Sequence, residues 1–430
     1  MAVLVLGGYG LVGSAVVERL SAAGVAVIGL GRDTAAAARR WPDVEWRTAD
    51  LARLRTAASW PPLLGGVDTV VNAAGVLQQG LRDDVAAVQL HAMRALYAAC
   101  ASAGVRRLVQ VSAAGAAPSA TLAFLSTKGQ ADEALRASGL EYVILRPALV
   151  ISPAAYGGTA LLRALAAFPA VTPLVFAESP VQTVWIGDLA EAVSAAVAGR
   201  MASGATLDLA EGAQRSLAET VRLLRAWLGL PPAPVLRLPA AVAGLAAGVA
   251  DALGWLGWRS PLRSTAMAVM RAGVVAGGGA IPGLGRELIS LPETLRRMPA
   301  GPQERWFARL WLLKPLIIGG LAAFWLTSGA IGLARLAAAT EVLTLRGVPE
   351  GLARGAALGG GILDLALGAA VLIRPTSGWA LRGMVLAGLA YMGGAAILAP
   401  DLWLDPLGPM VKVVPAVLLS LAALAILDDR

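Results

Sequence analysis

The sequence has 430 residues, of which 57% are hydrophobic and 15% are charged, and it contains one cysteine and one histidine. This composition excludes a disordered chain and a disulfide scaffold, and the lack of soft ligands excludes a zinc or iron–sulfur site, so no metal is expected. The net charge of +8 does not indicate nucleic-acid binding, because zinc-finger spacing, lysine-rich runs and interleaved aromatic residues are all missing from the sequence.

The chain begins with a strand, a glycine-rich turn and a helix, in that order. Residues 3–6 (VLVL) are typical of a buried strand, and a helical pattern (SAVVERLSAAG) follows the turn. Glycines allow a tight turn and close approach of the backbone to a pyrophosphate, whose charge then lies at the positive end of the helix. We therefore expect a dinucleotide to bind at Gly7, Tyr9, Gly10, Leu11, Val12 and Gly13.

A second strand is expected over residues 25–30 (VAVIGL), and Gly31-Arg32-Asp33 follows it. Cofactors with a free ribose 2′-hydroxyl usually meet a carboxylate at this point, whereas an arginine can pair with a 2′-phosphate. Arg32 therefore favours NADP over NAD. The alternatives are that Arg32 is a solvated loop residue and that the adjacent Asp33 meets a ribose hydroxyl.

Further strands are expected over residues 44–48, 67–72, 108–112 and 142–146, with helices over 85–103 and 128–138 between them. Strands that alternate with helices predict an α/β fold with a doubly wound parallel sheet of the Rossmann type. We assign this domain to residues 1–204. Cys100 and His91 fall in the predicted helix 85–103 and are interpreted as structural.

Over these two hundred residues the chain resembles the short-chain dehydrogenase/reductase superfamily in its extended or atypical branch. The matching motifs are GGYGLVG (7–13), Asp50-Leu51, Asn72-Ala73-Ala74-Gly75, Val111-Ser112, Lys128, LRPALV (145–150) and WIGDLAEAV (185–193). The resemblance implies that Asp50 and Leu51 lie at the adenine, Ala73, Ala74 and Gly75 along the cofactor, and Lys128 at the nicotinamide ribose. Ser112 and Lys128 would be the catalytic residues, with Ser112 orienting a substrate carbonyl.

The sequence departs from that family at one position. Redox members place a tyrosine four residues before the lysine, whereas this chain has Phe124 there. A phenyl ring has no proton to donate, and loss of a general acid typically costs about 10²- to 10⁴-fold in rate. Either another donor acts, with Ser126 and Tyr156 as candidates, or the domain binds a nucleotide without turnover.

Residues 205–305 form a proline-rich connector with short helices, which in extended reductases contributes the substrate lobe. An apolar lobe next to a membrane favours a hydrophobic, lipid-like or quinone-like substrate. The apolar run 239–258 contains Asp251 and ends in tryptophans, so it is interpreted as an interfacial or buried helix, with a membrane span as the alternative.

Residues 306–430 are expected to form an all-α bundle of four transmembrane helices. The spans are placed at about 315–334, 355–373, 383–399 and 406–427, of which the first has twenty uncharged residues, enough to cross a hydrocarbon core of roughly 30 Å. Their many glycines are typical of closely packed membrane helices.

Basic residues set the predicted orientation. Before the first span lie Arg296, Arg297, Arg305, Arg309 and Lys314. Because cytoplasmic flanks carry such an excess, we expect a multi-pass protein of a bacterial inner membrane with its N-terminal domain in the cytoplasm.

This C-terminal part resembles the DoxX-like family of four-helix membrane domains. The similarity rests on Trp325-Leu-Thr-Ser-Gly329, on Gly361-Ile-Leu-Asp364 with Gly368, and on Trp403-Leu-Asp405-Pro-Leu-Gly-Pro409 followed by Lys412. The resemblance implies a link to membrane redox systems and hence a membrane redox partner. Asp364 lies within a span, where an ionisable group is costly. Lys412 is its expected partner, and both a structural contact and a proton or quinone site remain open.

Two functions follow from these features. The first is a membrane-anchored NAD(P)-dependent oxidoreductase that acts on a hydrophobic substrate. The second is a non-catalytic NAD(P)-binding accessory or regulatory module of a membrane redox system. Phe124 favours the second, and the retention of Lys128 favours the first. A transporter that uses Asp364 is a weaker third reading, because four spans form a small bundle.

Overall fold

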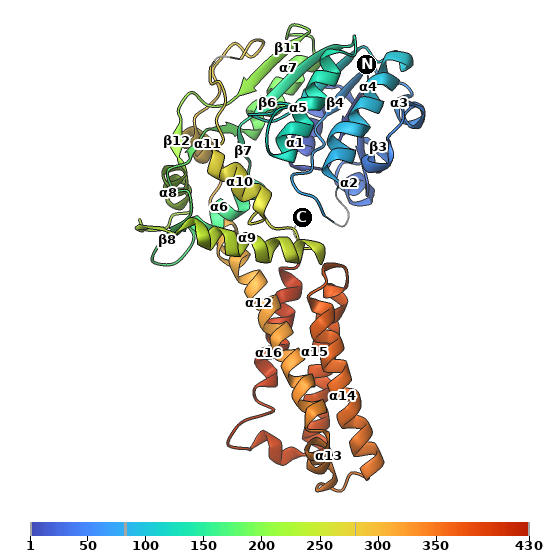
Figure 1. Ribbon diagram of the computed structural model, residues 1–430, viewed down its shortest axis with the longest axis vertical. Helices are drawn as coiled ribbons and strands as arrows, with labels where there is room; N and C mark the ends of the chain where they lie inside the picture. The colour runs from blue at the N-terminus through green and yellow to red at the C-terminus, as the bar shows by residue number, and fades with distance from the viewer. Residues whose placement is uncertain (1, 81–83, 280, 429–430) are drawn as a thin grey trace. The chain divides into compact units, whose positions relative to one another are not determined.

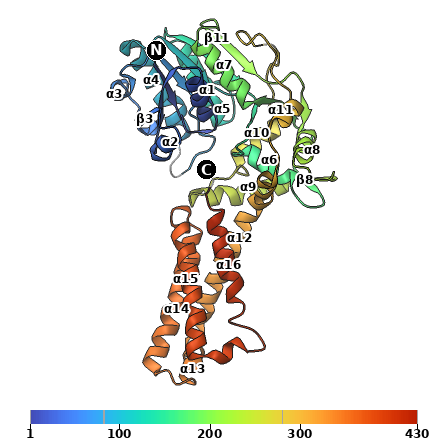
Figure 2. The same ribbon diagram turned by 180° about the vertical axis from the view of Figure 1, so that it is seen from behind.

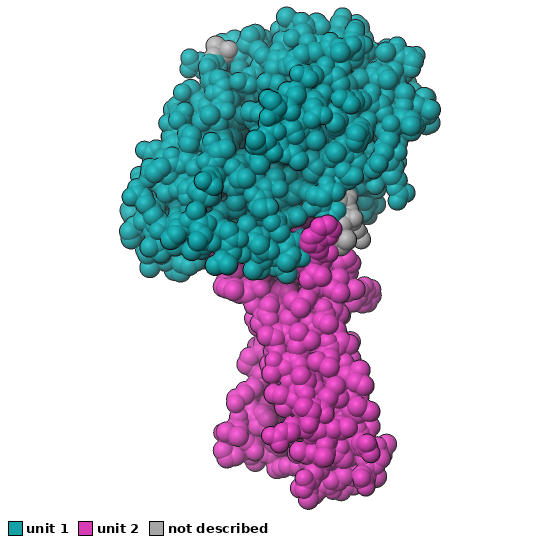
Figure 3. All heavy atoms as spheres, in the orientation of Figure 1, with its two compact units in different colours: residues 1–254, 260–308 teal, residues 255–259, 309–430 magenta. Residues whose placement is uncertain are grey.

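The computed structural model describes residues 2–80, 84–279 and 281–428 (Figure 1), and Figure 2 shows the opposite side. The chain divides into two compact units, which Figure 3 distinguishes by colour. The N-terminal unit comprises residues 1–254 and 260–308, and the C-terminal unit comprises residues 255–259 and 309–430.

A parallel sheet of seven strands, in the order β11-β6-β5-β4-β1-β2-β3, forms the centre of the N-terminal unit. Its strands are β1 (Ala2–Leu6), β2 (Ala26–Gly31), β3 (Glu45–Thr48), β4 (Thr69–Asn72), β5 (Arg107–Val111), β6 (Glu141–Pro147) and β11 (Ala205–Leu209). The strand order reverses at β1, where Val3 is paired with Val27 of β2 on one side and with Thr69 of β4 on the other. Open α/β sheets bind ligands at such a reversal. The predicted doubly wound parallel sheet is confirmed.

Both faces of the sheet are covered by helices. Side chains of a strand alternate between the faces, so Val3 and Val5 of β1 pack in one core, whereas Leu4 and Leu6 pack in the other. The first core includes α1 (Leu11–Ala22) and α7 (Ile186–Val197), and the second includes α3 (Pro61–Leu64), α4 (Ala92–Ala103) and α5 (Ala123–Arg136). The short helix α2 (Ala35–Arg40) follows β2.

The helix boundaries differ in part from the prediction. The helix expected over 85–103 begins with a π-helical turn (Ala87–His91), which passes directly into α4. Helix α5 begins at Ala123, five residues before the expected start at Lys128. Strand β11 begins at Ala205, immediately beyond the boundary expected at residue 204, and pairs with β6.

A third hydrophobic core lies within residues 149–308 of the N-terminal unit. Its helices are α6 (Gly158–Ala166), α8 (Leu217–Trp227) and α11 (Leu291–Arg297), and Ala308 of α12 packs there too. Three two-stranded sheets join them: β7 (Leu149–Ile151) with β10 (Thr183–Trp185), β9 (Pro180–Val181) with β12 (Arg215–Ser216), and β8 (Thr172–Leu174) with β13 (Val235–Arg237). Helices α9 (Ala240–Trp255) and α10 (Ser264–Ala272) also belong to this part of the chain.

Within the residues that the structure describes, three helices are long and apolar enough to cross a membrane: α12 (Pro302–Ala334), α14 (Glu350–Val371) and α15 (Arg374–Leu398). They expose large apolar side chains such as Leu316, Ile331, Leu386 and Ile397. A water-soluble bundle would bury such residues, so this pattern is typical of helices that face lipid. The shorter helices of this unit are α13 (Leu336–Thr344) and α16 (Val413–Ala425).

The predicted spans 315–334, 355–373 and 383–399 thus correspond to long apolar helices, although α12 begins 13 residues earlier than expected and continues through Pro315. The fourth predicted span, 406–427, contains α16, which begins only at Val413 and has 13 residues. At about 1.5 Å per residue such a helix is shorter than a hydrocarbon core of roughly 30 Å. A fourth crossing therefore stays a prediction.

Glycines let α12 and α14 approach each other closely. A Cβ atom at Gly361 would lie 2.8 Å from the side chain of Leu333, and one at Gly329 would lie 2.6 Å from the carbonyl oxygen of Gly361. Small residues at such crossings are typical of membrane helix pairs.

Replacing Gly361 by leucine should therefore separate α12 from α14 and lower the free energy of unfolding of the bundle by about 1–3 kcal/mol, the usual cost of overpacking. Gly359→Leu is the matched control, because a Cβ at Gly359 meets no atom within 4 Å. The measurement is unfolding of both variants in detergent micelles. Equal midpoints for the two variants would contradict this packing.

Candidate functional site

The glycine-rich turn between β1 and α1 is shaped by contacts that only glycine allows. Gly7 has a φ of 69°, and its N–H donates to the carbonyl oxygen of Leu30 at the end of β2. A Cβ at Gly13 would lie 2.1 Å from the carbonyl oxygen of Gly7. The first turn of α1 is therefore pressed directly against the turn that precedes it.

The beginning of α1 is suited to an anion. Its N-cap residue, Gly10, makes no side-chain capping bond, and its first turn contains no acidic residue. The first N–H groups of a helix have no partner within the helix, and together with the helix dipole they attract negative charge. The start of α1 therefore offers backbone N–H groups and positive partial charge to a pyrophosphate, and Gly10 adds no side chain in front of them.

Tyr9 lies across the end of β2, where a Cβ at Gly31 would lie 2.1 Å from the tyrosine ring. The Tyr9 hydroxyl accepts hydrogen bonds from the backbone N–H groups of Arg32, at 3.2 Å, and Asp33, at 3.4 Å. Both residues are exposed. The structure therefore brings Tyr9 and Arg32 together at the position where the adenosine ribose is expected.

The loops after β3 and β4 lie at the same edge of the sheet. Asp50 caps a short 3₁₀ helix (Leu51–Arg53) by accepting from the N–H of Ala52 at 3.1 Å. In the second loop the N–H of Ala74 donates to the buried Asn72 side chain at 3.1 Å. A Cβ at Gly7 would lie 3.0 Å from the Cα of Ala74, so this loop borders the glycine turn.

Lys128 on α5 is buried beside this loop, with 6% of its surface exposed. Its ammonium group donates to the carbonyl oxygen of Val111 at 2.9 Å and lies 5.8 Å from the centre of the Phe124 ring. A Cβ at Gly75 would lie 3.7 Å from Nζ. Burial lowers the pKa of Lys128 to about 8, against the opposing charge of Asp132.

Ser112 is buried at the end of β5, and its hydroxyl donates to Asp132 at 2.8 Å. Asp132 also accepts from the guanidinium of Arg146 at 3.0 Å. Burial raises the pKa of Asp132, while the bonds from Ser112 and Arg146 and the charge of Lys128 oppose that rise. Asp132 thus contacts Ser112 directly and influences Lys128 through its charge.

Asp132 and Arg146 were not assigned a role from the sequence. The sequence contains a signal for the role of Asp132, because this residue lies four residues after Lys128 and residues at that spacing share one face of a helix. The role of Arg146 depends on how α5 lies beside β6, which the sequence does not specify. Among the described residues, Oδ1 of Asp132 is buried without a hydrogen-bond partner.

The other candidate donors lie in different surroundings. The Ser126 hydroxyl bonds to the carbonyl oxygen of Ala123 in its own helix, at 3.3 Å. Tyr156 is 36% exposed in the loop before α6. His91 lies exposed at the end of the π-helical turn, whereas Cys100 is fully buried in the second core. Within the described parts of the chain, no cluster of three metal-ligating side chains occurs.

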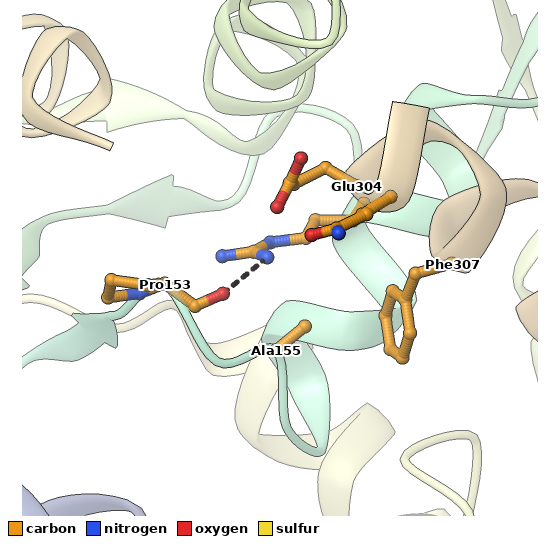
Figure 4. A pocket seen from close by; sticks show the side chains of 6 residues that line it. Pro153, Ala155, Glu304 and Phe307 are labelled. Atoms are coloured by element: carbon orange, nitrogen blue, oxygen red, sulfur yellow. Dashed lines mark hydrogen bonds between the residues drawn. The ribbon is translucent and has the colours of Figure 1, made fainter. Parts of the chain in front are cut away.

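A separate pocket of about 200 Å³ lies between the region of α6 and the first turns of α12 (Figure 4). Its lining residues are Pro153, Ala155, Arg163, Gln303, Glu304 and Phe307. The buried Arg163 donates to the carbonyl oxygen of Pro153 at 3.0 Å, and Glu304 adds an opposite charge nearby. Ligand pockets usually measure about 300–1,000 Å³, so this one is too small for a dinucleotide.

In the C-terminal unit Asp364 of α14 is buried between two neighbouring helices. It accepts hydrogen bonds of 2.7 Å from the hydroxyls of Ser328 on α12 and Tyr391 on α15. The ring of Trp325 lies 6.3 Å from that of Tyr391. The prediction that Lys412 pairs with Asp364 is wrong: Lys412 is exposed at the start of α16, and hydroxyl groups satisfy the carboxylate instead.

Two family models match the chain. Residues 7–168 match a model described as NAD(P)H-binding, and residues 322–421 match the DoxX-like family. No curated protein matches the sequence.

Among solved structures, the triphenylmethane reductase of Citrobacter sp., complexed with NADP(H), superposes with a TM-score of 0.54 and is 18% identical in sequence. The match covers 70% of this chain and 100% of the reductase chain. The UDP-glucose 4-epimerase of Thermotoga maritima, with UDP-glucose, is also 18% identical and has a TM-score of 0.47. That match covers 56% of this chain and 86% of the epimerase chain. The first similarity supports the fold assigned to the N-terminal unit.

Proposed function

We propose that this chain, in which an NAD(P)-binding Rossmann-like domain is followed by a DoxX-like membrane domain, is a membrane-anchored oxidoreductase that reduces a hydrophobic carbonyl compound or quinone. The observation that carries the proposal is Lys128. Its ammonium group is buried beside the Gly75 loop, and burial lowers its pKa to about 8. A proton donor with a pKa near the working pH is therefore available in spite of Phe124.

In the proposed reduction, the residues of the chain would have the following roles. The N–H groups at the start of α1 bind the pyrophosphate, and Lys128 holds a proton at the edge of the loop of Ala73 to Gly75. A nicotinamide bound there would supply a hydride to the substrate. The proton on Nζ of Lys128 passes to the substrate oxygen, which leaves a neutral amine, and this amine regains its proton from water. Asp132, fixed by Ser112 and Arg146, is a positioning residue for Lys128.

A hydrophobic substrate is supported by the DoxX-like domain, since it attaches the nucleotide domain to the compartment where lipids and quinones dissolve. We further propose that the nucleotide domain lies in the cytoplasm of a bacterial cell, at its inner membrane. The support is the group of basic residues near the start of α12, including Arg305, Arg309 and Lys314.

The test is NADPH consumption by the full-length protein in detergent micelles, with a panel of short-chain quinones and aldehydes. We expect at least one member of the panel to be reduced with loss of NADPH fluorescence. Tight NADPH binding without consumption across the panel would favour the second candidate, a non-catalytic NAD(P)-binding module. Phe124 supports that alternative, because it replaces the usual tyrosine. Faster NADPH consumption by the Phe124→Tyr variant would show that the site can still bind cofactor and substrate in a reactive arrangement.

The preference for NADP over NAD is also a proposal, and it rests on Arg32 after β2. Replacing Arg32 by serine should weaken NADPH binding roughly 10- to 150-fold, because a charge-assisted hydrogen bond contributes about 1.5–3 kcal/mol, and should leave NADH binding unchanged. Arg39→Ser, at an exposed position of α2, is the matched control. Fluorescence titration gives both affinities, and an unchanged ratio of the two would remove Arg32 from the cofactor site.

A further inference from the structure

Helix α9 has an outer face composed of apolar residues alone. Its large side chains are Val242, Leu245, Val249 and Trp255, which are 42%, 76%, 63% and 66% exposed. Between them lie smaller exposed residues, Ala241, Gly244, Gly248 and Ala252. The opposite face is buried and consists of Ala243, Ala247, Ala250 and Gly254. An exposed apolar patch of this kind usually marks a surface that something covers.

The single charged residue of α9 lies away from this outer face. Asp251 is half-buried and forms an ion pair of 3.0 Å with Arg263, and it also accepts from the N–H of Ser264. The charge on the helix is therefore satisfied within the N-terminal unit. It does not oppose contact of the outer face with an apolar medium.

The residues that directly follow α9 belong to the C-terminal unit. The indole of Trp258 donates to the carbonyl oxygen of Leu372 at 2.6 Å, and the N–H of Arg374 donates to the carbonyl oxygen of Leu256 at 2.9 Å. Leu372 directly follows α14 and Arg374 is the first residue of α15, and both helices are long enough to span a membrane. The connection between two consecutive spans lies at a membrane surface, so the end of α9 is tied to that surface by covalent continuity.

We propose that the outer face of α9 lies in the interfacial region of the lipid bilayer, on the side where α14 ends and α15 begins. Its 16 residues extend about 24 Å as a helix, which is short for a span. Trp255 and Trp258 at its end are the residue type that membrane interfaces favour.

The experiment uses the full-length protein in vesicles of phosphatidylcholine and phosphatidylglycerol, with a polarity-sensitive fluorophore on an introduced cysteine. The sites are Leu245→Cys and Val249→Cys, and Glu133→Cys on the exposed side of α5 is the matched control. The native Cys100 is fully buried, and labelling of the unsubstituted protein checks that it does not react. Nitroxide-labelled lipids quench from the headgroup region or from deep in the acyl chains.

We expect a blue-shifted emission at positions 245 and 249, quenching by the shallow nitroxide, and a depth of about 5–10 Å below the headgroup boundary. The label at position 133 should be quenched by aqueous iodide alone. Three results would overturn the proposal: iodide quenching at 245 equal to that at 133, maximal quenching by the deep nitroxide, as in a membrane span, or shielding from both lipid and iodide, as under a protein partner.

Discussion

Replacing Lys128 by methionine is expected to slow hydride transfer by about 10²- to 10⁴-fold, the usual contribution of a positioned proton donor. The reason is that the ammonium group lies at the Gly75 loop, while Phe124 has no proton to give. Methionine keeps most of the length and apolar character of the lysine stem, so the helix should remain folded. The measurement is the single-turnover rate of NADPH oxidation with the best substrate of the panel.

The pH dependence gives the same prediction a second readout. Reduction needs the protonated form of Lys128, so the rate should fall as the pH rises through the pKa of about 8. Lys128→Arg should lose this inflection, because a guanidinium stays protonated. Glu133→Gln, at an exposed position of the same helix, controls for general effects on α5. A methionine variant that keeps the wild-type rate and pH profile would exclude Lys128 as the donor.

Replacing Gly13 by alanine is expected to abolish tight NADPH binding and to destabilise the N-terminal unit. The new Cβ would lie 2.1 Å from the carbonyl oxygen of Gly7, a backbone atom that cannot move unless the glycine turn moves too. Overpacking of this kind typically costs about 1–3 kcal/mol. Part of that cost would appear as a lower unfolding midpoint, and the displaced turn would no longer fit a pyrophosphate.

Gly65→Ala is the matched control for Gly13→Ala. A Cβ at Gly65 would meet no atom within 4 Å, and the backbone there has a negative φ of −57°. Thermal unfolding followed by intrinsic fluorescence, together with NADPH titration, should therefore separate the two variants clearly. If both alanine variants bound NADPH as the wild type does, the glycine turn could not be the pyrophosphate cradle.

Much of the central sheet could be predicted from the sequence because strands such as β1, β2 and β6 carry a short apolar run, whereas β11 (ATLDL) contains polar residues and was not expected as a strand. Residues 3–6 and 25–30 were found in this way, and β1 and β2 occupy nearly the same positions. Helix boundaries were less predictable. Helix α5 begins without a side-chain cap at Leu122, so no capping residue marks its first turn in the sequence.

The residues of the candidate site could be predicted only where they belong to a motif that is contiguous in the sequence. The glycine turn is contiguous, whereas the Asp132–Arg146 ion pair joins a helix to a strand through the tertiary fold. The incorrect prediction that Lys412 pairs with Asp364 has a related cause. Opposite charge suggested Lys412, but the helix arrangement brings the uncharged hydroxyls of Ser328 and Tyr391 to the carboxylate.

The most direct test of the proposed function is to follow deuterium from the nicotinamide. The full-length protein in detergent is given NADPH that carries the label at the transferable position, together with the quinone and aldehyde panel, and the label remaining in the nicotinamide is measured by mass spectrometry. We predict that the label leaves the nicotinamide with the wild type and Glu133→Gln and is retained with Lys128→Met. Retention of the label by the wild-type protein with every substrate, at saturating NADPH, would contradict the proposal and indicate a binding module without turnover.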